Sequence, residues 1–209
     1  MDILEKLNTR YATKLFDSSK KVSDDDMAKL LEAIRLSASS FGLQPYKVLV
    51  VEDPAIRTEL RKVGYDQSQI TDASALLVFA VNTNTNSESV DEFIDLISET
   101  RNFPKENLAG YSDMMKGSLQ SQSPEQVEAW STKQAYIALG FGLVSAANLD
   151  IDACPMEGFS PDDFDKILDL GKLGLKSKVI MAVGYRSKDD GYQQLAKVRR
   201  KLGDFIVKF

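Results

Sequence analysis

The chain has 209 residues, of which 43% are hydrophobic and 27% are charged. This length and apolar content are typical of one globular domain with a full core, so we expect a single domain over residues 1–209. Acidic residues outnumber basic residues by 31 to 26, and the basic residues are dispersed, which argues against a nucleic-acid partner. No run approaches the ~20 apolar residues of a membrane span, so we expect no membrane partner.

Residue chemistry narrows the possible reactions further. The chain has no histidine, which excludes a Ser-His-Asp triad and leaves a zinc site only Cys154 and carboxylates, so we expect no metal site. Cys154 is the single cysteine and cannot form an internal disulfide, and the chain opens without the charged and apolar regions of a signal peptide. We therefore expect a reducing, cytoplasmic location.

The first elements along the chain are expected to be helical. Residues 1–7 are expected to form a short helix, and residues 10–16 a loop. Ser23 precedes three aspartates, and a capping hydroxyl with carboxylates in the first turn is typical of a helix start rather than a metal site. The apolar stripe expected on this second helix consists of Met27, Leu30, Leu31, Ile34 and Leu36.

Continuous apolar runs rich in β-branched residues predict buried strands. These runs are residues 48–51, 75–81 and 179–183. Between the strands, helices are expected at residues 54–63, 90–97 and 124–148. The last of these helices is expected to bury Trp130, Ala135, Ile137, Leu139, Leu143, Val144 and Ala147.

Two glycines, Gly140 and Gly142, have the spacing found in dinucleotide-binding fingerprints. That fingerprint must open a helix directly after a strand, whereas these glycines lie well inside a helical pattern. Glycine there costs ~1 kcal/mol relative to alanine and usually permits close helix packing. We therefore interpret the pair as a helix–helix contact, with a dimer interface as one candidate.

Polar and turn-forming residues predict the connections. Residues 83–89 and 117–123 are expected to be loops. Residues 155–158 are expected to form a turn, and Ser160 followed by proline indicates a helix start directly after it. Residues 205–209 resemble a strand, so this apolar tail needs something to pair with.

Basic residues gather at two distant places, from Arg10 to Lys14 and at Lys197 and Arg199. On an acidic chain without histidine, such localised positive charge is typical of a site for one anionic ligand. Guanidinium and ammonium groups make charge-assisted hydrogen bonds with phosphate. If the fold brings these segments together, they form a phosphate-binding site.

Five segments resemble, in the same order along the chain, the FMN-dependent nitroreductases and flavin reductases. The resemblance covers essentially the whole chain. The segments are Arg10-Tyr11-Ala12-Thr13-Lys14 with Phe16-Asp17, residues 37–46 ending in Gln44-Pro45-Tyr46, residues 67–74 beginning Gln67-Ser68-Gln69, Pro155-Met156-Glu157-Gly158-Phe159, and Lys197-Val198-Arg199.

The resemblance implies an α+β fold of the nitroreductase type, with a central mixed, mainly antiparallel sheet flanked by helices. It implies a homodimer in which the C-terminal extension adds a strand to the partner's sheet. It also implies an FMN-dependent oxidoreductase that takes hydride from NADH or NADPH and passes it through flavin N5 to a nitroaromatic or quinone by ping-pong kinetics. Two alternatives stay open: a relative that reduces free flavin, a pteridine, an enone or a halogenated tyrosine, and a flavin-binding protein without turnover.

The resemblance also implies roles for individual residues. Arg10, Lys197 and Arg199 are expected to bind the FMN phosphate, and Lys14 to lie near ring atoms N1 and O2. The Glu157 backbone amide is expected to donate to N5, so that its side chain matters less than its backbone. Further cofactor contacts are expected from Tyr11, Ala12, Ala38, Ser39, Ser40, Gly42, Asp66, Gln67, Gln69, Gln134, Pro155, Met156 and Gly158.

Several of these residues differ from the family pattern or have more than one possible role. Ser39 and Ser40 resemble residues that reach the partner subunit's cofactor, and which of Asp66, Gln67 and Gln69 contacts the ring is left open. Ala12 stands where many relatives have a serine, and Gly42 replaces a common asparagine, so one side-chain contact is lost at the first and put in doubt at the second. Phe41 and Tyr111 are expected either to narrow a substrate channel or to pack as ordinary aromatic residues.

Overall fold

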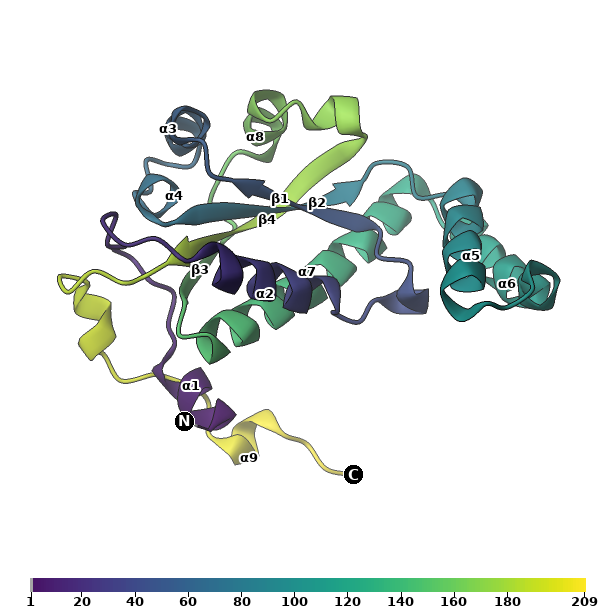
Figure 1. Cartoon of the computed structure of the whole chain (residues 1–209). Helices are drawn as coiled ribbons and strands as arrows, with labels where there is room; N and C mark the ends of the chain where they lie inside the picture. The colour runs from purple at the N-terminus through teal and green to yellow at the C-terminus, as the bar shows by residue number, and fades with distance from the viewer. Residues whose placement is uncertain (1) are drawn as a thin grey trace.

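The computed structural model describes residues 2–209, and Met1 lies outside the described residues. Four strands form one sheet: β1 (Tyr46–Val51), β2 (Ala75–Asn82), β3 (Asp152–Met156) and β4 (Leu175–Gly184) (Figure 1). The helices are α1 (Ile3–Thr9), α2 (Asp24–Arg35), α3 (Pro54–Val63), α4 (Gln69–Asp72), α5 (Ser87–Arg101), α6 (Ala109–Gln120), α7 (Pro124–Asn148), α8 (Pro161–Ile167) and α9 (Leu202–Phe205). Short 3-10 turns are η1 (Ser40–Gly42), η2 (Lys105–Leu108), η3 (Leu170–Leu173) and η4 (Gly191–Gln194).

The strand order is β1-β2-β4-β3, and every pair of neighbours is antiparallel. A single parallel bridge, between Ala12 and Ala153, places the N-terminal loop beside β3. The central strands β2 and β4 are almost completely buried, whereas β1 and β3 form the edges. The α+β prediction is confirmed.

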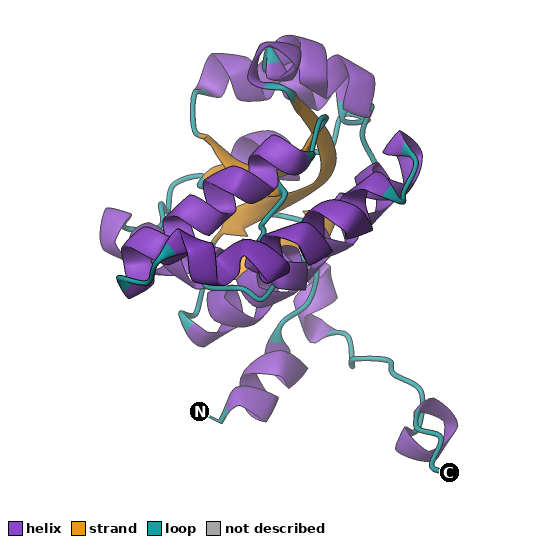
Figure 2. Ribbon diagram, turned by 90° about the vertical axis from the view of Figure 1, so that its right-hand side faces the viewer, coloured by secondary structure: helices purple, strands orange, loops and turns teal. Residues whose placement is uncertain are grey.

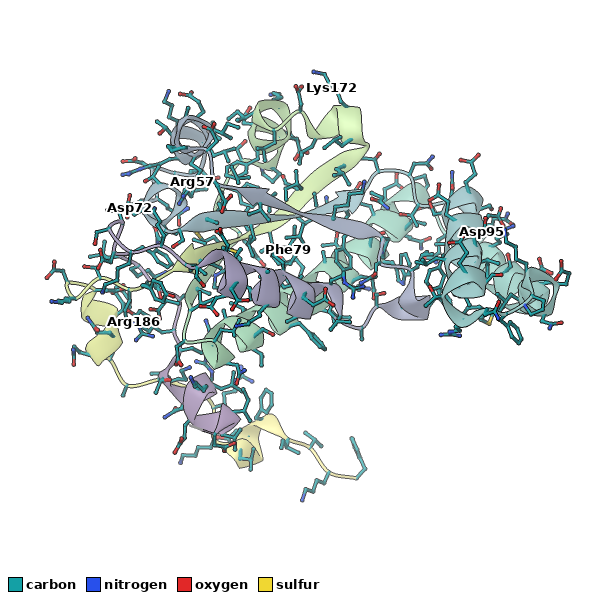
Figure 3. All side chains as sticks on the ribbon, viewed as in Figure 1. Arg57, Asp72, Phe79, Asp95, Lys172 and Arg186 are labelled. Atoms are coloured by element: carbon teal, nitrogen blue, oxygen red, sulfur yellow. The ribbon has the colours of Figure 1, made fainter. Side chains whose placement is uncertain are left out.

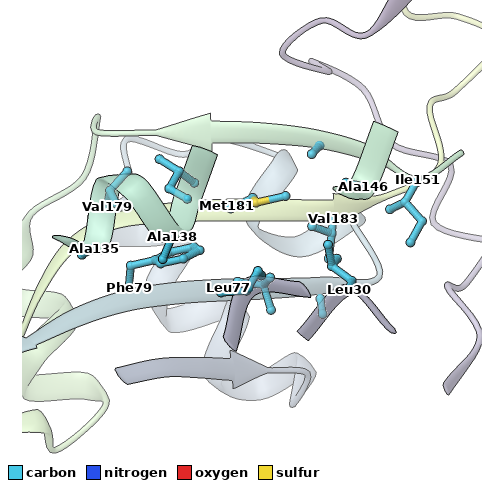
Figure 4. Close-up of a cluster of buried hydrophobic side chains, with 14 of the residues drawn as sticks. Leu30, Leu77, Phe79, Ala135, Ala138, Ala146, Ile151, Val179, Met181 and Val183 are labelled. Carbon is cyan, nitrogen blue, oxygen red and sulfur yellow. The ribbon is translucent and has the colours of Figure 1, made fainter. Parts of the chain in front are cut away.

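Helices cover both faces of the sheet, and Figure 2 shows the sheet lying between them. Alternate residues of β2 and β4 point to opposite faces, because side chains in a strand repeat every two residues. On one face Leu77, Phe79 and Met181 pack against α2 and α7 (Figure 4). On the other face Leu76 and Ile180 belong to the cluster that includes α3, α4 and α8. Each fully buried side chain of this kind contributes about 1.5–3 kcal/mol, so both layers are needed for stability.

Helices α5 and α6 form a separate hairpin that extends from one end of the sheet (Figure 1). Val90, Ile94 and Ile97 of α5 pack against Met115 and Leu119 of α6. This small core explains why the predicted loop at residues 117–123 was wrong: α6 continues to Gln120, because burial of Leu119 outweighs the ~1 kcal/mol that Gly117 costs. The predicted loop at 83–89 is also shorter, since Asn86 caps α5.

Capping signals located several helices correctly. Ser23 Oγ accepts from the Asp26 N–H at the start of α2, and Ser123 makes a full capping box at the start of α7. Helices α3 and α7 have the predicted bounds. Helix α1 is shifted from the predicted 1–7 because Asp2 caps it at Ile3.

Several apolar positions expected inside are exposed. Leu36, expected on the buried stripe, caps the end of α2 and is 64% exposed. On α7, Ile137 is 41% and Val144 40% exposed, and Trp130 and Leu143 are only partly buried. The strand predicted to be buried at 48–51 is the edge strand β1, where Val50 is 39% exposed. Helix α7 therefore has an apolar face that the rest of residues 2–209 does not cover.

The turn predicted at residues 155–158 begins later than predicted, and the strand predicted for the tail has no partner within one chain. Pro155 and Met156 belong to β3, since a proline without an N–H is tolerated on an edge strand, so the turn begins at Glu157. The tail at 205–209 forms no strand: α9 ends at Phe205, and the remaining residues have no strand partner within the described chain. The pairing expected for this segment was with a second protomer, so it stays a prediction.

Arg57 is a buried cation that fixes α4 before β2 (Figure 3). Its Nε donates to the Ile70 carbonyl at 2.7 Å and its Nη2 to the Ala73 carbonyl at 2.7 Å. Burial lowers the pKa of Arg57. These bonds satisfy carbonyl groups at the end of α4 and so hold the segment that carries Gln67.

No helix within residues 2–209 is both long enough and apolar enough to cross a membrane.

Candidate functional site

A basic cavity of about 470 Å³ lies where the N-terminal loop, the end of β3 and the C-terminal segment meet. The two predicted basic segments, although nearly the whole chain apart, line it together, and Figure 1 shows the C-terminal chain beside α1. The predicted site residues at this cavity are Arg10, Tyr11, Ala12, Lys14, Pro155, Lys197 and Arg199.

Three cations in this cavity lie close to one another without a balancing acid. Lys197 Nζ donates to the carbonyls of Leu7 and Arg10, and Arg199 Nη1 donates to the Val198 carbonyl at 2.7 Å. None of the three forms an ion pair with a carboxylate of residues 2–209. Burial and the neighbouring Arg199 lower the pKa of Arg10, and burial, Arg10 and Arg199 lower that of Lys197. Like charges held together in this way favour an anionic ligand.

Asp190 joins the two sides of the cavity, and the sequence analysis missed it. This carboxylate is 1% exposed. Its Oδ2 accepts from the Tyr11 hydroxyl at 2.9 Å and from the Lys14 N–H at 2.8 Å, while its Oδ1 accepts from the Tyr192 N–H at 3.0 Å. Burial opposes the charged form, but these bonds and one from the Leu15 N–H at 3.1 Å lower the pKa of Asp190. The sequence carries no distinct signal for it, because Asp190 is one of 31 acidic residues and directly follows another, Asp189.

Tyr11 is held from both sides. Burial and the bond to Asp190 raise its pKa, so the hydroxyl stays protonated. The guanidinium of Arg186 lies 4.7 Å from the centre of its ring. Arg186 (Figure 3) also forms an ion pair with Asp152 of β3, with 2.7 Å between Nε and Oδ1. The N-terminal loop is therefore fixed against β3 and the end of β4.

The turn after β3 presents two free main-chain donors. Within residues 2–209 neither the Glu157 N–H nor the Gly158 N–H donates a hydrogen bond. Gln67 Nε2 donates to the Gly158 carbonyl at 2.6 Å, and the Tyr136 hydroxyl donates to Glu157 Oε1 at 2.5 Å. A flat ligand lying over this turn has two N–H groups available to it.

The three residues between which the sequence did not decide differ in position. Gln67 lies against the turn, and because its Nε2 also donates to the Gly64 carbonyl at 2.9 Å, only its Oε1 remains for a ligand. The Asp66 carboxylate forms an ion pair with Arg61 at 2.7 Å. Gln69 is 8% exposed at the start of α4. Of the three, Gln67 is the one that contacts the turn.

The predicted segment 38–42 lies elsewhere, next to α7 and the α5–α6 hairpin. The Ser40 N–H donates to Gln134 Oε1 at 2.8 Å, and the Tyr111 hydroxyl donates to the Phe41 carbonyl at 2.9 Å. The structure thus brings Phe41 and Tyr111 together, in a cluster with residues of α5 and α6.

The backbone conformation and a neighbouring ring both favour glycine at position 42. Its φ of +81° is in the region that favours glycine, and an added Cβ would lie 3.0 Å from the Phe93 ring. An asparagine at this position would require Phe93 to move.

The two groups of predicted residues do not meet within one protomer. Residues 38–42, Tyr111 and Gln134 do not line the basic cavity. Figure 1 places α1 and the α5–α6 hairpin at opposite ends of the molecule. A second protomer is required if both groups are to contact the same ligand.

Comparison with known proteins assigns the family. The model of the family described as "Nitroreductase family" matches residues 7–185. A Bacillus subtilis (strain 168) protein, provisionally named NAD(P)H nitroreductase YfkO, is 36% identical over 198 residues, which cover 90% of each chain. The "Major NAD(P)H-flavin oxidoreductase" of Aliivibrio fischeri is 32% identical over 212 residues, covering 98% of this chain and 97% of its own.

The fold is also shared with solved structures. One is a provisionally assigned nitroreductase from Exiguobacterium sibiricum 255-15, solved in complex with FMN. Its TM-score is 0.86 at 17% identity, and the match covers 100% of this chain and 98% of that one. The chain belongs to the nitroreductase family.

Proposed function

We propose that this protein is an FMN-dependent NAD(P)H oxidoreductase that reduces nitroaromatics, quinones or related acceptors. The observation that carries this proposal is the basic cavity next to a turn with two free N–H groups. The names of the Bacillus subtilis and Aliivibrio fischeri relatives support the use of NAD(P)H, and the Exiguobacterium sibiricum complex supports FMN.

The residues present fit FMN. A phosphate dianion would relieve the mutual repulsion of Arg10, Lys197 and Arg199, which have no carboxylate ion pair in the described chain. Charge-assisted hydrogen bonds of this kind are about twice as strong as neutral ones. Bound FMN supplies hydride transfer at N5. The Glu157 N–H is the donor that we assign to that atom.

Lys14 has a separate role from the phosphate ligands. Its ammonium lies 6.0 Å from the centre of the Tyr192 ring at the rim of the cavity, and its backbone N–H is held by Asp190. A cation near a ring that gains negative charge on reduction favours the reduced state. Lys14 therefore tunes the cofactor rather than holding it.

The complete site requires a homodimer. Val207 is 75% exposed and Ile206 46% exposed in the tail, while β1 leaves one edge of the sheet unpaired. A groove between α2 and β1, lined by Leu31, Tyr46 and Val48, lies along that edge. We place the tail of one protomer at this edge of its partner's sheet. In the same dimer, residues 38–42 of one protomer reach the cofactor of the other.

NADH or NADPH and the acceptor use the same site in turn, which gives ping-pong kinetics. Reduction of free flavin is the second candidate reaction, because the Aliivibrio fischeri relative is named a flavin oxidoreductase. We also include a pteridine or an enone among the candidate acceptors. We propose a cytoplasmic location for the protein. The protons required can come from water, so the absence of histidine is tolerable.

An anaerobic titration tests the function. Protein reconstituted with FMN should lose its visible flavin absorbance when NADH or NADPH is added, and regain it with a quinone, a nitroaromatic or free flavin. Comparing these acceptors separates the candidate reactions. Protein that binds FMN but is never reduced by either nucleotide would instead be a flavin-binding protein without turnover.

A further inference from the structure

We propose that the side chains of Tyr136 and Glu157 form a positioning pair that holds the free N–H groups of residues 157 and 158 in place for the flavin. This inference rests on the proposed function. It gives the Glu157 side chain a role beside that of its backbone amide.

The pair joins a helix to the turn that follows the neighbouring strand. Tyr136 lies in the middle of α7, and Glu157 directly follows β3. The Tyr136 hydroxyl donates to Glu157 Oε1 at 2.5 Å. Helix α7 is anchored by the core through Ala135, Ala138 and Leu139, so it is a rigid point of attachment for the turn.

The chain on both sides of the turn is fixed by other contacts. Met156 is paired with Ile180 in the sheet. After the turn, the Ser160 N–H donates to the Val63 carbonyl at 3.0 Å, and Phe159 packs on Phe164 with ring centres 4.5 Å apart. Between Met156 and Phe159 the only main-chain hydrogen bond of the described residues lies within the turn itself, from the Phe159 N–H to the Glu157 carbonyl at 3.0 Å. That bond does not tie the turn to another element, so side chains supply the attachment.

Two side chains from other elements attach the turn to the rest of the fold. Gln67 Nε2 donates to the Gly158 carbonyl at 2.6 Å, and Tyr136 holds the Glu157 carboxylate. Both bonds leave the N–H groups of Glu157 and Gly158 free of partners within the described chain. The arrangement fixes the peptide units without using the donors that a ligand needs.

The bond also controls where the carboxylate points. A carboxylate facing a ring that becomes negative on reduction would oppose reduction. Donation from Tyr136 keeps the Glu157 carboxylate directed at α7. Burial and Glu157 raise the pKa of Tyr136 to about 12, so the hydroxyl remains a donor at neutral pH.

Four variants reconstituted with FMN test the pair: Tyr136→Phe, Glu157→Ala, the double variant, and Glu157→Gln, which keeps an oxygen acceptor for the tyrosine. The readouts are the affinity for oxidised FMN and the two-electron reduction potential. Thr132→Val is the control, because it removes a hydroxyl one turn earlier on α7 that bonds only to the Glu128 carbonyl, at 2.8 Å.

Tyr136→Phe and Glu157→Ala should each reduce the preference for reduced over oxidised FMN by about threefold to tenfold, as expected for one lost hydrogen bond. A tenfold change corresponds to about 30 mV for a two-electron couple. The double variant should match Glu157→Ala, because without the carboxylate the Tyr136 hydroxyl has no partner in the turn to lose. Glu157→Gln and Thr132→Val should stay close to the wild type.

Other results overturn the inference. Wild-type potentials in Tyr136→Phe and Glu157→Ala, or additive effects in the double variant, would show that the pair does not position the turn. A shift in Glu157→Gln equal to that in Glu157→Ala would assign the effect to charge instead. If the wild-type protein binds no FMN, the proposed function itself fails; normal FMN binding and reduction with unchanged variants refutes the positioning pair alone.

Discussion

Asp190 is the residue on which the geometry of the basic cavity depends. One buried carboxylate accepts hydrogen bonds from Tyr11, Lys14, Leu15 and Tyr192, and so ties the N-terminal loop to the segment that leads to Lys197. Although burial works against it, this negative charge also helps to raise the pKa of Arg186, which holds the Tyr11 ring. Asp190 therefore positions the cavity rather than the ligand.

Asp190→Asn should weaken FMN binding by about tenfold and destabilise the fold by about 1–3 kcal/mol, because one oxygen acceptor is replaced by an amide donor that faces other donors. Titration of apoprotein with FMN and chemical denaturation measure the two effects. Asp189→Asn is the matched control, since Asp189 is exposed. Equal losses in both variants would remove Asp190 from this role.

The same carboxylate predicts a pH dependence. The folded state lowers the pKa of Asp190 below its unfolded value of ~3.9, so its stabilisation is present above that value and lost as pH falls through the folded pKa. Between pH 5 and 2 the wild type should therefore lose more stability than Asp190→Asn. Denaturation midpoints across that range check this. Parallel curves for the two proteins would contradict the assignment.

Lys14→Met should shift the FMN reduction potential downward, because a cation near the ring favours the reduced flavin. The affinity for oxidised FMN should change less than it does when a phosphate ligand is removed. Lys21→Met, an exposed lysine outside the cavity, is the control. An unchanged potential and turnover in Lys14→Met would count against its role at the ring.

Residues in the cavity show how far sequence reasoning reaches. Arg10, Lys14, Lys197 and Arg199 were found because basic residues stand out on an acidic chain. Asp190 was not found, because its function depends on which donors the fold brings to it, and a single acid among many carries no such signal.

At the scale of elements, helices that are set by local capping signals could be predicted from the sequence, whereas elements that depend on tertiary packing could not. Helices α3 and α7 have their predicted bounds because Asp53 and Ser123 cap them and a proline follows at the first position. Helix α6 was not predicted, because its stability comes from packing on α5 rather than from its Gly-containing sequence. The strand expected for the tail depends on a second protomer, so it stays a prediction.

The exposed face of α7 is the element that we expect to form the dimer interface. Ile137, Phe141 and Val144 are each at least 40% exposed, although each is apolar. Ile137→Glu would place a charge in this interface, so the protein should change from a dimer to a monomer of 23.2 kDa. FMN binding should weaken as well, because the site is shared between protomers. Light scattering measures the mass.

Leu173→Glu is the control for that substitution, because Leu173 is 57% exposed in η3 on another part of the surface. It should leave the dimer intact. A wild-type protein with the mass of a single chain would contradict the whole arrangement, since Ser39 and Ser40 would then never reach a cofactor in the basic cavity.

At the scale of the whole molecule, the two groups of residues that we propose to bind the ligand lie in separate parts of the fold. The basic cavity lies near α1, and residues 38–42 lie near α5 and α6 (Figure 1). The order of the five family segments predicted the fold and the family. Spacing along the sequence could not predict that the segments divide into two groups, because that division follows from the packing of α2 and α7 on the sheet.

The central claim is that the basic cavity binds the phosphate of FMN, and a comparison of FMN with riboflavin tests it most directly. Riboflavin has the same ring without the phosphate. Two or more charge-assisted hydrogen bonds should make FMN bind at least 100-fold more tightly to the apoprotein, and Lys197→Met should remove most of that difference while exposed Lys188→Met preserves it. Equal affinities for FMN and riboflavin in the wild type, or an unchanged ratio in Lys197→Met, would contradict the account.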